Sequence, residues 1–159
     1  MTVIKDGQAA ANPWTHLPDS TQPVDGPVTV PLACWLAERE ALRGRGQPVG
    51  VRLATSDAPE TLTDDLPTLP LIVLDMTLFT DGRVFTQARI LRERLGYRGE
   101  IRVRGDFLRD QMFFLSRVGV NAFEFPEGVD LADRQRAFRE FTITYQAAAD
   151  NPLPLYRRR

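Results

Sequence analysis

Residues 79–125 decide the fold, and they read FTDGRVFTQARILRERLGYRGEIRVRGDFLRDQMFFLSRVGVNAFEF. Apolar side chains recur at helical spacing in the first part of this stretch. They predict a helix over residues 84–95 whose buried stripe consists of Val84, Ala88, Leu91 and Leu95. Gly96 follows directly and is a natural end for this helix, because glycine adopts the left-handed backbone of a C-terminal cap without strain.

A strand, a second helix and a second strand complete the stretch. Residues 100–104 (EIRVR) alternate polar and apolar side chains, which predicts a strand with one face or one end in water. Asp106 is placed to cap a helix over residues 107–118, and Gly119 ends it. Residues 122–125 form the last strand. All connections in the stretch are only a few residues long.

The chain outside this stretch repeats the same alternation. Residues 49–54 predict a strand, and residues 69–74 (LPLIVL) are almost entirely apolar, which is typical of a strand buried on both faces of a parallel sheet. Further helices are predicted over residues 31–44, 59–66 and 130–147. Strands near 49, 70, 101 and 122 are each followed by a helix, so we predict an α/β fold with a parallel sheet of about four βα units.

Two arrangements of these four units remain open from the sequence. The units could follow one another round a half-barrel, or they could form a small, open, doubly wound sheet. The similar spacing of the units and their short loops favour the half-barrel-like arrangement.

The sequence predicts three segments. Residues 1–30 are rich in Pro, Gly, Asp and Thr and are expected to form a loose N-terminal arm with short extended pieces at residues 2–4 and 14–16. A hairpin turn is expected at residues 5–7, and Trp14 is expected to hold the arm to the body. Residues 31–149 form a single α/β domain, and residues 150–159 form an extended tail.

Composition limits the possible functions. The chain has 159 residues and a formal net charge of −1, and its N-terminal half is acidic, so we expect no nucleic-acid binding. No apolar run approaches a membrane span and no signal peptide precedes the domain, so we expect a cytoplasmic protein that does not bind membranes. Cys34 is the only cysteine and His16 the only histidine, which argues against a redox pair or a Cys/His zinc site in one chain. We expect no metal and no cofactor.

Charged residues follow the predicted strands at the edge where ligands of parallel sheets bind. Asp75 ends one strand, Asp81 and Arg83 lie in the following loop, and Arg104 and Asp106 end the next strand. Together with the N-termini of the helices they could bind a small anion. The alternative is structural: Asp81 and Asp106 cap helices, and Arg83 pairs with Asp81.

Catalytic templates fit the sequence poorly. A Ser-His-Asp triad would require His16, which we expect to be an exposed structural residue in the arm. Cys34 lies inside a predicted helix without a basic neighbour and is expected to be a small buried side chain. No Gly-rich phosphate loop is present. The catalytic residues, if the protein is an enzyme, are unknown from the sequence.

The central stretch resembles a known family. Its members are bacterial proteins encoded beside sulfite reductase in assimilatory sulfur operons and labelled as putative oxidoreductases of sulfite reduction. The resemblance covers roughly residues 30–147 and is carried by Asp81-Gly82-Arg83, Ala88-Arg89, Leu91-Arg92, Gly96-Tyr97, Gly99-Glu100, Arg102, Gly105-Asp106, Asp110-Gln111, Arg117 and Gly119.

The resemblance implies an accessory protein of assimilatory sulfite reduction that binds the reductase or its electron donor. The alternative is a small enzyme acting on an anionic substrate at the carboxyl edge of the sheet. Arg104 departs from the family pattern, so the implied anion site consists of Asp75, Asp81, Arg83, Arg102 and Asp106. The implied partner contacts are Arg89, Arg92, Asp110 and Gln111, although Gln111 could instead be a buried hydrogen-bonding group.

Overall fold

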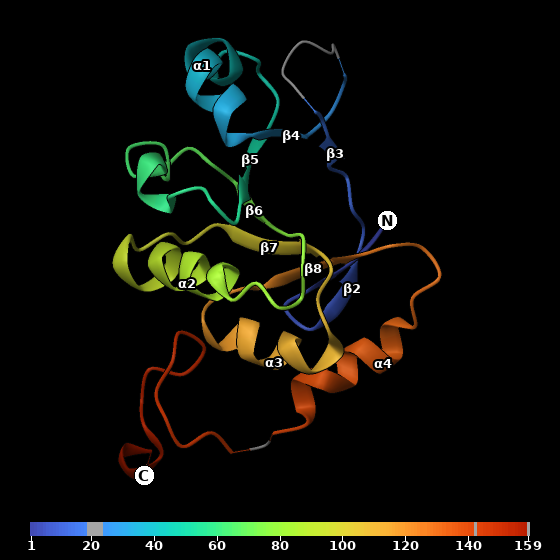
Figure 1. Ribbon diagram of the computed structural model, residues 1–159, viewed down its shortest axis with the longest axis vertical. Coiled ribbons are helices and arrows are strands. Elements are labelled where there is room, and N and C mark those ends of the chain that lie inside the picture. Colours follow the sequence, from blue (N-terminus) through green and yellow to red (C-terminus); the bar gives the residue numbers. More distant parts are fainter. Residues whose placement is uncertain (19–23, 142, 159) are drawn as a thin grey trace.

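A computed structural model describes residues 1–18, 24–141 and 143–158 (Figure 1). Eight strands form one sheet in the order β2-β1-β8-β7-β6-β5-β4-β3. The strands are β1 (Thr2–Lys5), β2 (Gln8–Ala10), β3 (Thr15–His16), β4 (Val28–Pro31), β5 (Val49–Ala54), β6 (Leu71–Met76), β7 (Glu100–Gly105) and β8 (Ala122–Phe125). The α-helices are α1 (Leu32–Arg43), α2 (Arg83–Arg89, continued by a π-helical turn at Ile90–Arg94), α3 (Arg109–Arg117) and α4 (Leu131–Arg136).

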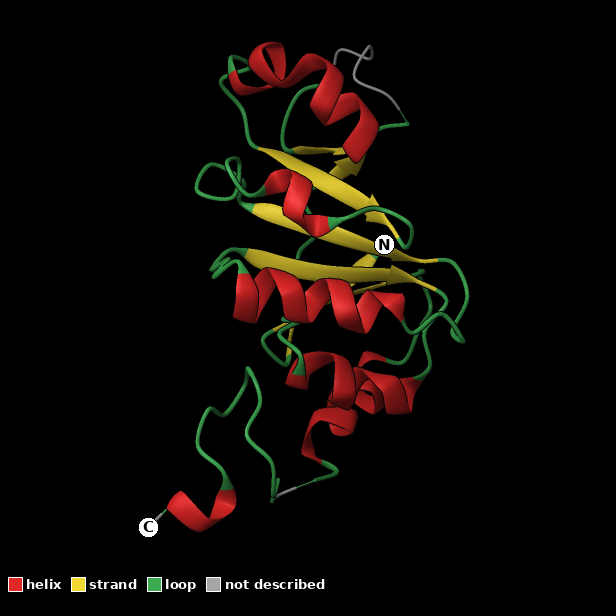
Figure 2. Cartoon of the chain, turned by 60° about the vertical axis from the view of Figure 1, so that its left-hand side comes forward, coloured by secondary structure: helices red, strands yellow, loops and turns green. Residues whose placement is uncertain are grey.

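The strands from β3 to β8 are parallel and lie beside one another in chain order. Right-handed connections between sequential parallel strands place their helices on the same side of the sheet. Figures 1 and 2 show the helices following the outside of the curved sheet. The predicted α/β class and the half-barrel alternative are therefore confirmed.

The sheet is mixed and larger than the predicted sheet of about four parallel strands. β1 runs antiparallel to β8 and β2 runs antiparallel to β1. The sequence predicts a loose arm over residues 1–30, but the described part of this segment supplies four short strands. The hairpin turn is found where it is predicted, at Asp6 (φ 50°) and Gly7 (φ 76°). Residues 19–23 of the predicted arm lie outside the described residues.

The connection from β2 to β3 explains the curvature of the sheet. These strands lie at opposite edges, yet only residues 11–14 separate Ala10 from Thr15. Seven interstrand spacings would place the edges of a flat sheet about 34 Å apart, whereas five Cα–Cα steps span at most about 18 Å. The sheet must therefore curl, and the connection crosses the side opposite α1 and α2 (Figure 1). We call residues 11–14 the strap.

The hydrophobic core lies between the sheet and its helices. Alternate strand residues such as Leu53, Leu74 and Val103 are fully buried and pack in one cluster with Leu91 and Leu115 from the helices. Full burial of each such side chain contributes about 1.5–3 kcal/mol. The predicted apolar stripe of α2 is buried at Val84, Ala88 and Leu91, with Leu95 partly buried.

Several predicted helix limits are wrong. The predicted helix over residues 59–66 is a single 3₁₀ turn, Pro59–Leu62, and the predicted helix over residues 130–147 ends at Arg136 and continues only as another 3₁₀ turn. Asp130 caps the start of α4 and accepts hydrogen bonds from the backbone N–H groups of residues 132 and 133. Asp106 caps no helix, because α3 begins after Leu108. No helix in the described parts of the chain is long and apolar enough to cross a membrane.

Candidate functional site

The face of the sheet opposite the helices carries a group of charged and polar side chains. In each strand the residues that alternate with the core residues point to this face, and the register places Asp75 beside Arg104 and Arg104 beside Glu124. We call this group the polar face. It consists of Lys5, His16, Thr29, Arg52, Asp75, Glu100, Arg102, Arg104 and Glu124.

Arg102 is the centre of the polar face. Its guanidinium lies 2.7 Å from the Glu100 carboxylate and 3.0 Å from that of Glu124, and it also donates to Asn12 of the strap at 2.8 Å. Lys5 completes the chain of charges at 2.8 Å from Glu100. Arg102 is only 2% exposed. The alternative of a wet face is therefore wrong, because residues distant in sequence cover Glu100 and Arg102. The alternative of a wet end is confirmed, because Arg104 is partly exposed and Gly105 is exposed.

His16 connects Glu124 to Thr29. A carboxylate only accepts hydrogen bonds, so Nε2 of His16 donates to Glu124 at 2.8 Å. The Thr29 hydroxyl accepts from Arg52 at 3.0 Å, so its own hydrogen is free for Nδ1 of His16 at 2.6 Å. Each nitrogen of the imidazole thus has a hydrogen-bond partner. The prediction of an exposed His16 is wrong, because Glu124, 108 residues away, holds it against the sheet.

This carboxylate–imidazole–hydroxyl order matches the chemical order of a hydrolase triad. However, Thr29 is 0% exposed and its oxygen already accepts from Arg52. A substrate carbonyl cannot reach such a hydroxyl. The arrangement therefore fixes the orientation of His16 rather than supplying a nucleophile.

Burial of Glu124 by itself raises the pKa of its carboxyl, but the hydrogen bonds and charges of His16 and Arg102 outweigh it and hold this pKa below its ordinary value of 4.5. Ionised Glu124 therefore stabilises the fold above pH 4.5, and this contribution is lost as the pH falls through the lower folded-state value.

We expect Glu124→Gln to be less stable than the wild type by a constant amount near pH 6, and this difference should shrink below about pH 4.5. Urea unfolding between about pH 6 and pH 3 measures it. Glu40→Gln, at a side chain that is 92% exposed, is the matched control and should show no such convergence. If the stability difference between Glu124→Gln and the wild type does not change with pH, the lowered pKa of Glu124 is contradicted.

The polar face opens to solvent at the carboxyl ends of β6 and β7. Arg104 donates through Nε to Asp75 at 2.5 Å, and Arg52 approaches the other Asp75 oxygen at 3.8 Å. The side chains of Asp75 and Arg104 are 26% and 30% exposed. Within the described residues the two terminal nitrogens of Arg104 donate no hydrogen bond, so they are available to an anionic group.

The structure separates the five residues of the predicted anion site. Asp81, which is partly buried in the loop after β6, pairs at 2.7 Å with the exposed Arg83 at the start of α2, and the hydrogen bonds from Arg83 hold the pKa of Asp81 far below its ordinary range. Arg102 is buried under the strap, and Asp106 is exposed after β7. Asp75 contacts Arg104 and Arg52 instead of these residues.

The predicted partner residues are also dispersed. Arg89 is exposed and pairs with Glu93 on its own helix, and Asp110 is exposed at the start of α3. Arg92 is directed inward and donates to the backbone carbonyls of residues 97, 99 and 119. Gln111 has the hydrogen-bonding role of the alternative prediction, because it bonds to backbone atoms on two loops.

Gln111 holds together a small exposed apolar surface. Its side chain accepts from the Leu108 backbone at 2.9 Å and donates to the Phe79 carbonyl at 2.7 Å. The side chains of Leu78, Phe79 and Leu108 are 60%, 43% and 44% exposed. We call these three residues the apolar rim. It lies on the loops that follow β6 and β7, which also carry the open end of the polar face.

The family of the chain follows from comparison with known proteins. A model of a bacterial protein family of unknown function, DUF934, matches residues 50–156. The chain belongs to this family. No curated protein and no solved structure matches the chain. The family match includes the charged residues of β5 to β8, but it excludes Lys5, His16 and Thr29, which complete the polar face from the N-terminal strands.

Six residues of the polar face do not appear among the predicted site residues: Lys5, His16, Thr29, Arg52, Glu100 and Glu124. Arg52 and Glu124 each carry a charge inside a short, otherwise apolar strand. A charge on a strand buried on both faces requires a partner, so this pattern could have indicated the polar face. The positions of His16 and Thr29 carry no comparable signal.

Proposed function

We propose that the protein is an accessory protein of assimilatory sulfite reduction that acts by binding sulfite reductase or its electron donor. The link to sulfite reduction rests on the resemblance of residues 79–125 to proteins encoded beside that enzyme. The observation that supports a binding role is the apolar rim at the carboxyl edge of the sheet.

The composition of the rim and its surroundings suits a transient protein interface. Exposed apolar side chains that lie together often mark interaction sites, and the centres of such interfaces are apolar with charged residues around them. Here Asp106 lies on the loop after β7, and Arg83 and Asp110 lie at the starts of α2 and α3, directly after the two loops. Gln111 fixes the two loops relative to each other, so little conformational freedom is lost when a partner binds.

A pull-down with a rim variant tests this proposal. Immobilised wild-type protein, cross-linked in an extract of sulfate-grown cells, is expected to retain sulfite reductase or its electron donor. Phe79→Asp combined with Leu108→Asp should reduce recovery at least about tenfold, because the loss of central apolar contacts costs about 2 kcal/mol or more.

Leu36→Asp is the matched control, because Leu36 is also apolar and 45% exposed but lies on α1. It should leave recovery unchanged. The proposal fails if the wild type retains neither of the two expected proteins, or if the rim variant retains them as well as the wild type does.

A second candidate is a small enzyme acting on an anionic substrate at the open end of the polar face. It is supported by the partly exposed Asp75 carboxylate between two arginines and by the unoccupied donors of Arg104. Arg104→Met separates the two proposals, since it removes these donors but leaves the apolar rim unchanged. Unchanged recovery in the pull-down favours the accessory role over the enzymatic one.

A further inference from the structure

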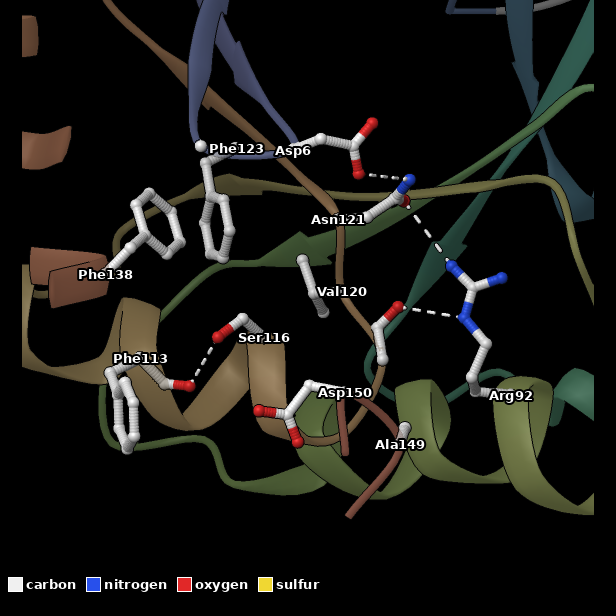
Figure 3. A pocket seen from close by; sticks show the side chains of 12 residues that line it. Asp6, Arg92, Phe113, Ser116, Val120, Asn121, Phe123, Phe138, Ala149 and Asp150 are labelled. Atoms are coloured by element: carbon white, nitrogen blue, oxygen red, sulfur yellow. Dashed lines mark hydrogen bonds between the residues drawn. The ribbon is translucent and has the colours of Figure 1, made fainter. Parts of the chain in front are cut away.

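A pocket of about 440 Å³ lies at the opposite end of the strands from the apolar rim (Figure 3). Five segments that are distant in sequence form it: the β1–β2 turn, the π-helical turn after α2, α3 with the loop to β8 and β8 itself, the 3₁₀ turn after α4, and the C-terminal segment near residue 150. Its volume is in the range of small-molecule sites. Neither the polar face nor the proposed function involves this pocket.

One wall of the pocket is aromatic. Phe113, Phe123 and Phe138 lie on the same side in Figure 3, and the rings of Phe123 and Phe138 are 5.4 Å apart between centroids. Val120 forms part of the floor. Such a wall accepts a flat apolar group, and the faces of the rings also attract a cation.

The opposite wall presents an acceptor. The carboxylate of Asp6 contacts the Asn121 side-chain amide through one oxygen at 3.3 Å, and its second oxygen accepts no hydrogen bond from the described residues. The backbone N–H of Asp6 donates to the Asn121 carbonyl at 2.8 Å, which fixes the turn that carries the carboxylate. Asp6 is therefore held at the pocket edge with a free acceptor.

Among the described residues one arginine, Arg92, lines the pocket, and it does not offer its donors to a ligand. Arg92 uses Nε and Nη1 on three backbone carbonyls, and its Nη2 lies 3.4 Å from Asn121. The lining also includes Asp150, which pairs with Arg117 at 3.3 Å. With two carboxylates and one arginine whose donors face the backbone, the lining disfavours an anion.

We infer that this pocket binds a small organic cation with a flat apolar body, such as an aryl amidinium or an arylalkyl ammonium. The ring packs against Phe113 and Phe138, and the cationic group donates to the free oxygen of Asp6. This inference does not rest on the proposed function, and the two can fail independently.

Titration calorimetry with benzamidine, benzamide and benzoate tests the inference. The three probes share a ring but carry a cationic, a neutral and an anionic group. The cation should bind at least about tenfold more tightly than the neutral amide, and the carboxylate should bind most weakly. Amide shifts in NMR spectra should locate benzamidine at Val120 and Asn121.

Asp6→Asn is the decisive variant. Asparagine tolerates the left-handed backbone of this turn, so the fold is kept while the charge is removed. We expect about a tenfold loss of benzamidine affinity and no change for benzamide. Asp64→Asn removes another exposed carboxylate and should change neither the affinity for benzamidine nor that for benzamide. The inference is overturned if benzamidine does not bind, if benzoate binds as tightly, or if Asp6→Asn binds benzamidine like the wild type.

Discussion

Replacing Arg102 with methionine is expected to destabilise the fold by about 3–5 kcal/mol, because it removes the buried cation that two buried carboxylates share. Arg102 is 2% exposed and lies between Glu100 and Glu124, which are 9% and 2% exposed. Methionine fills most of the volume, so the expected loss comes from charge rather than from a cavity. Urea unfolding monitored by circular dichroism measures it.

Two further variants make this prediction specific. Arg89→Met breaks an exposed pair on a helix surface, where the Arg89 side chain is 68% exposed, and should cost no more than about 0.5 kcal/mol. Adding Glu124→Gln to Arg102→Met should restore part of the lost stability, since it removes one of the unpaired charges. A loss below about 1 kcal/mol for Arg102→Met would show that solvent reaches these charges.

The parts of the fold that the sequence predicts correctly depend on local patterns. The stripe of Val84, Ala88 and Leu91 needs only helical periodicity, and the strand at Leu71–Met76 needs only a continuous apolar run. Because strands and helices alternate from residue 49 onward, the parallel order of β5 to β8 also follows. The choice of the half-barrel over an open sheet was favoured by the regular spacing but not determined by it.

The sequence predicts short extended pieces at residues 2–4 and 14–16, but it does not predict that they join the sheet, because this depends on partner strands elsewhere in the chain. β1 is four residues long and pairs with β8, 120 or so residues further along the chain. β3 has only two residues and pairs with β4. Such short, polar segments carry too little periodicity of their own. These segments become strands because they pair with a neighbouring strand that is already part of the sheet. Such pairing depends on the whole fold and not on the local sequence.

The polar face was missed for the same reason. The alternation of Glu100 and Arg102 with apolar residues is equally typical of a solvent-exposed strand face and of a covered one. In the structure this strand face is covered by the strap, whose Asn12 accepts a hydrogen bond from Arg102. The local sequence gives no sign that the strap crosses this face. Asp75 was predicted as a site residue because it ends a buried strand, and it does lie at the open end.

The second large loss of stability is expected when Gly105, the last residue of β7, is replaced by alanine. Its φ of +110° is strained for any residue with a Cβ, and an added Cβ would lie 2.2 Å from the backbone oxygen of Met76. That oxygen already accepts a hydrogen bond from the Asp106 N–H at 2.7 Å, so it cannot move away without breaking this bond. Gly105→Ala should therefore cost at least about 3 kcal/mol, combining backbone strain with overpacking.

Gly82→Ala is the matched control for this substitution. Gly82 has an α-helical backbone (φ −68°) directly before α2, and an added Cβ would meet nothing within 4 Å. This variant should be neutral, or more stable by up to about 1 kcal/mol because its unfolded chain is less flexible. Chemical unfolding of both variants under the same conditions gives the comparison. Equal stability would mean that β7 can end without the close approach of Gly105 to Met76. Since this approach also sets where the loop to Leu108 begins, a destabilised Gly105→Ala protein should bind a rim partner more weakly than the Gly82→Ala protein does.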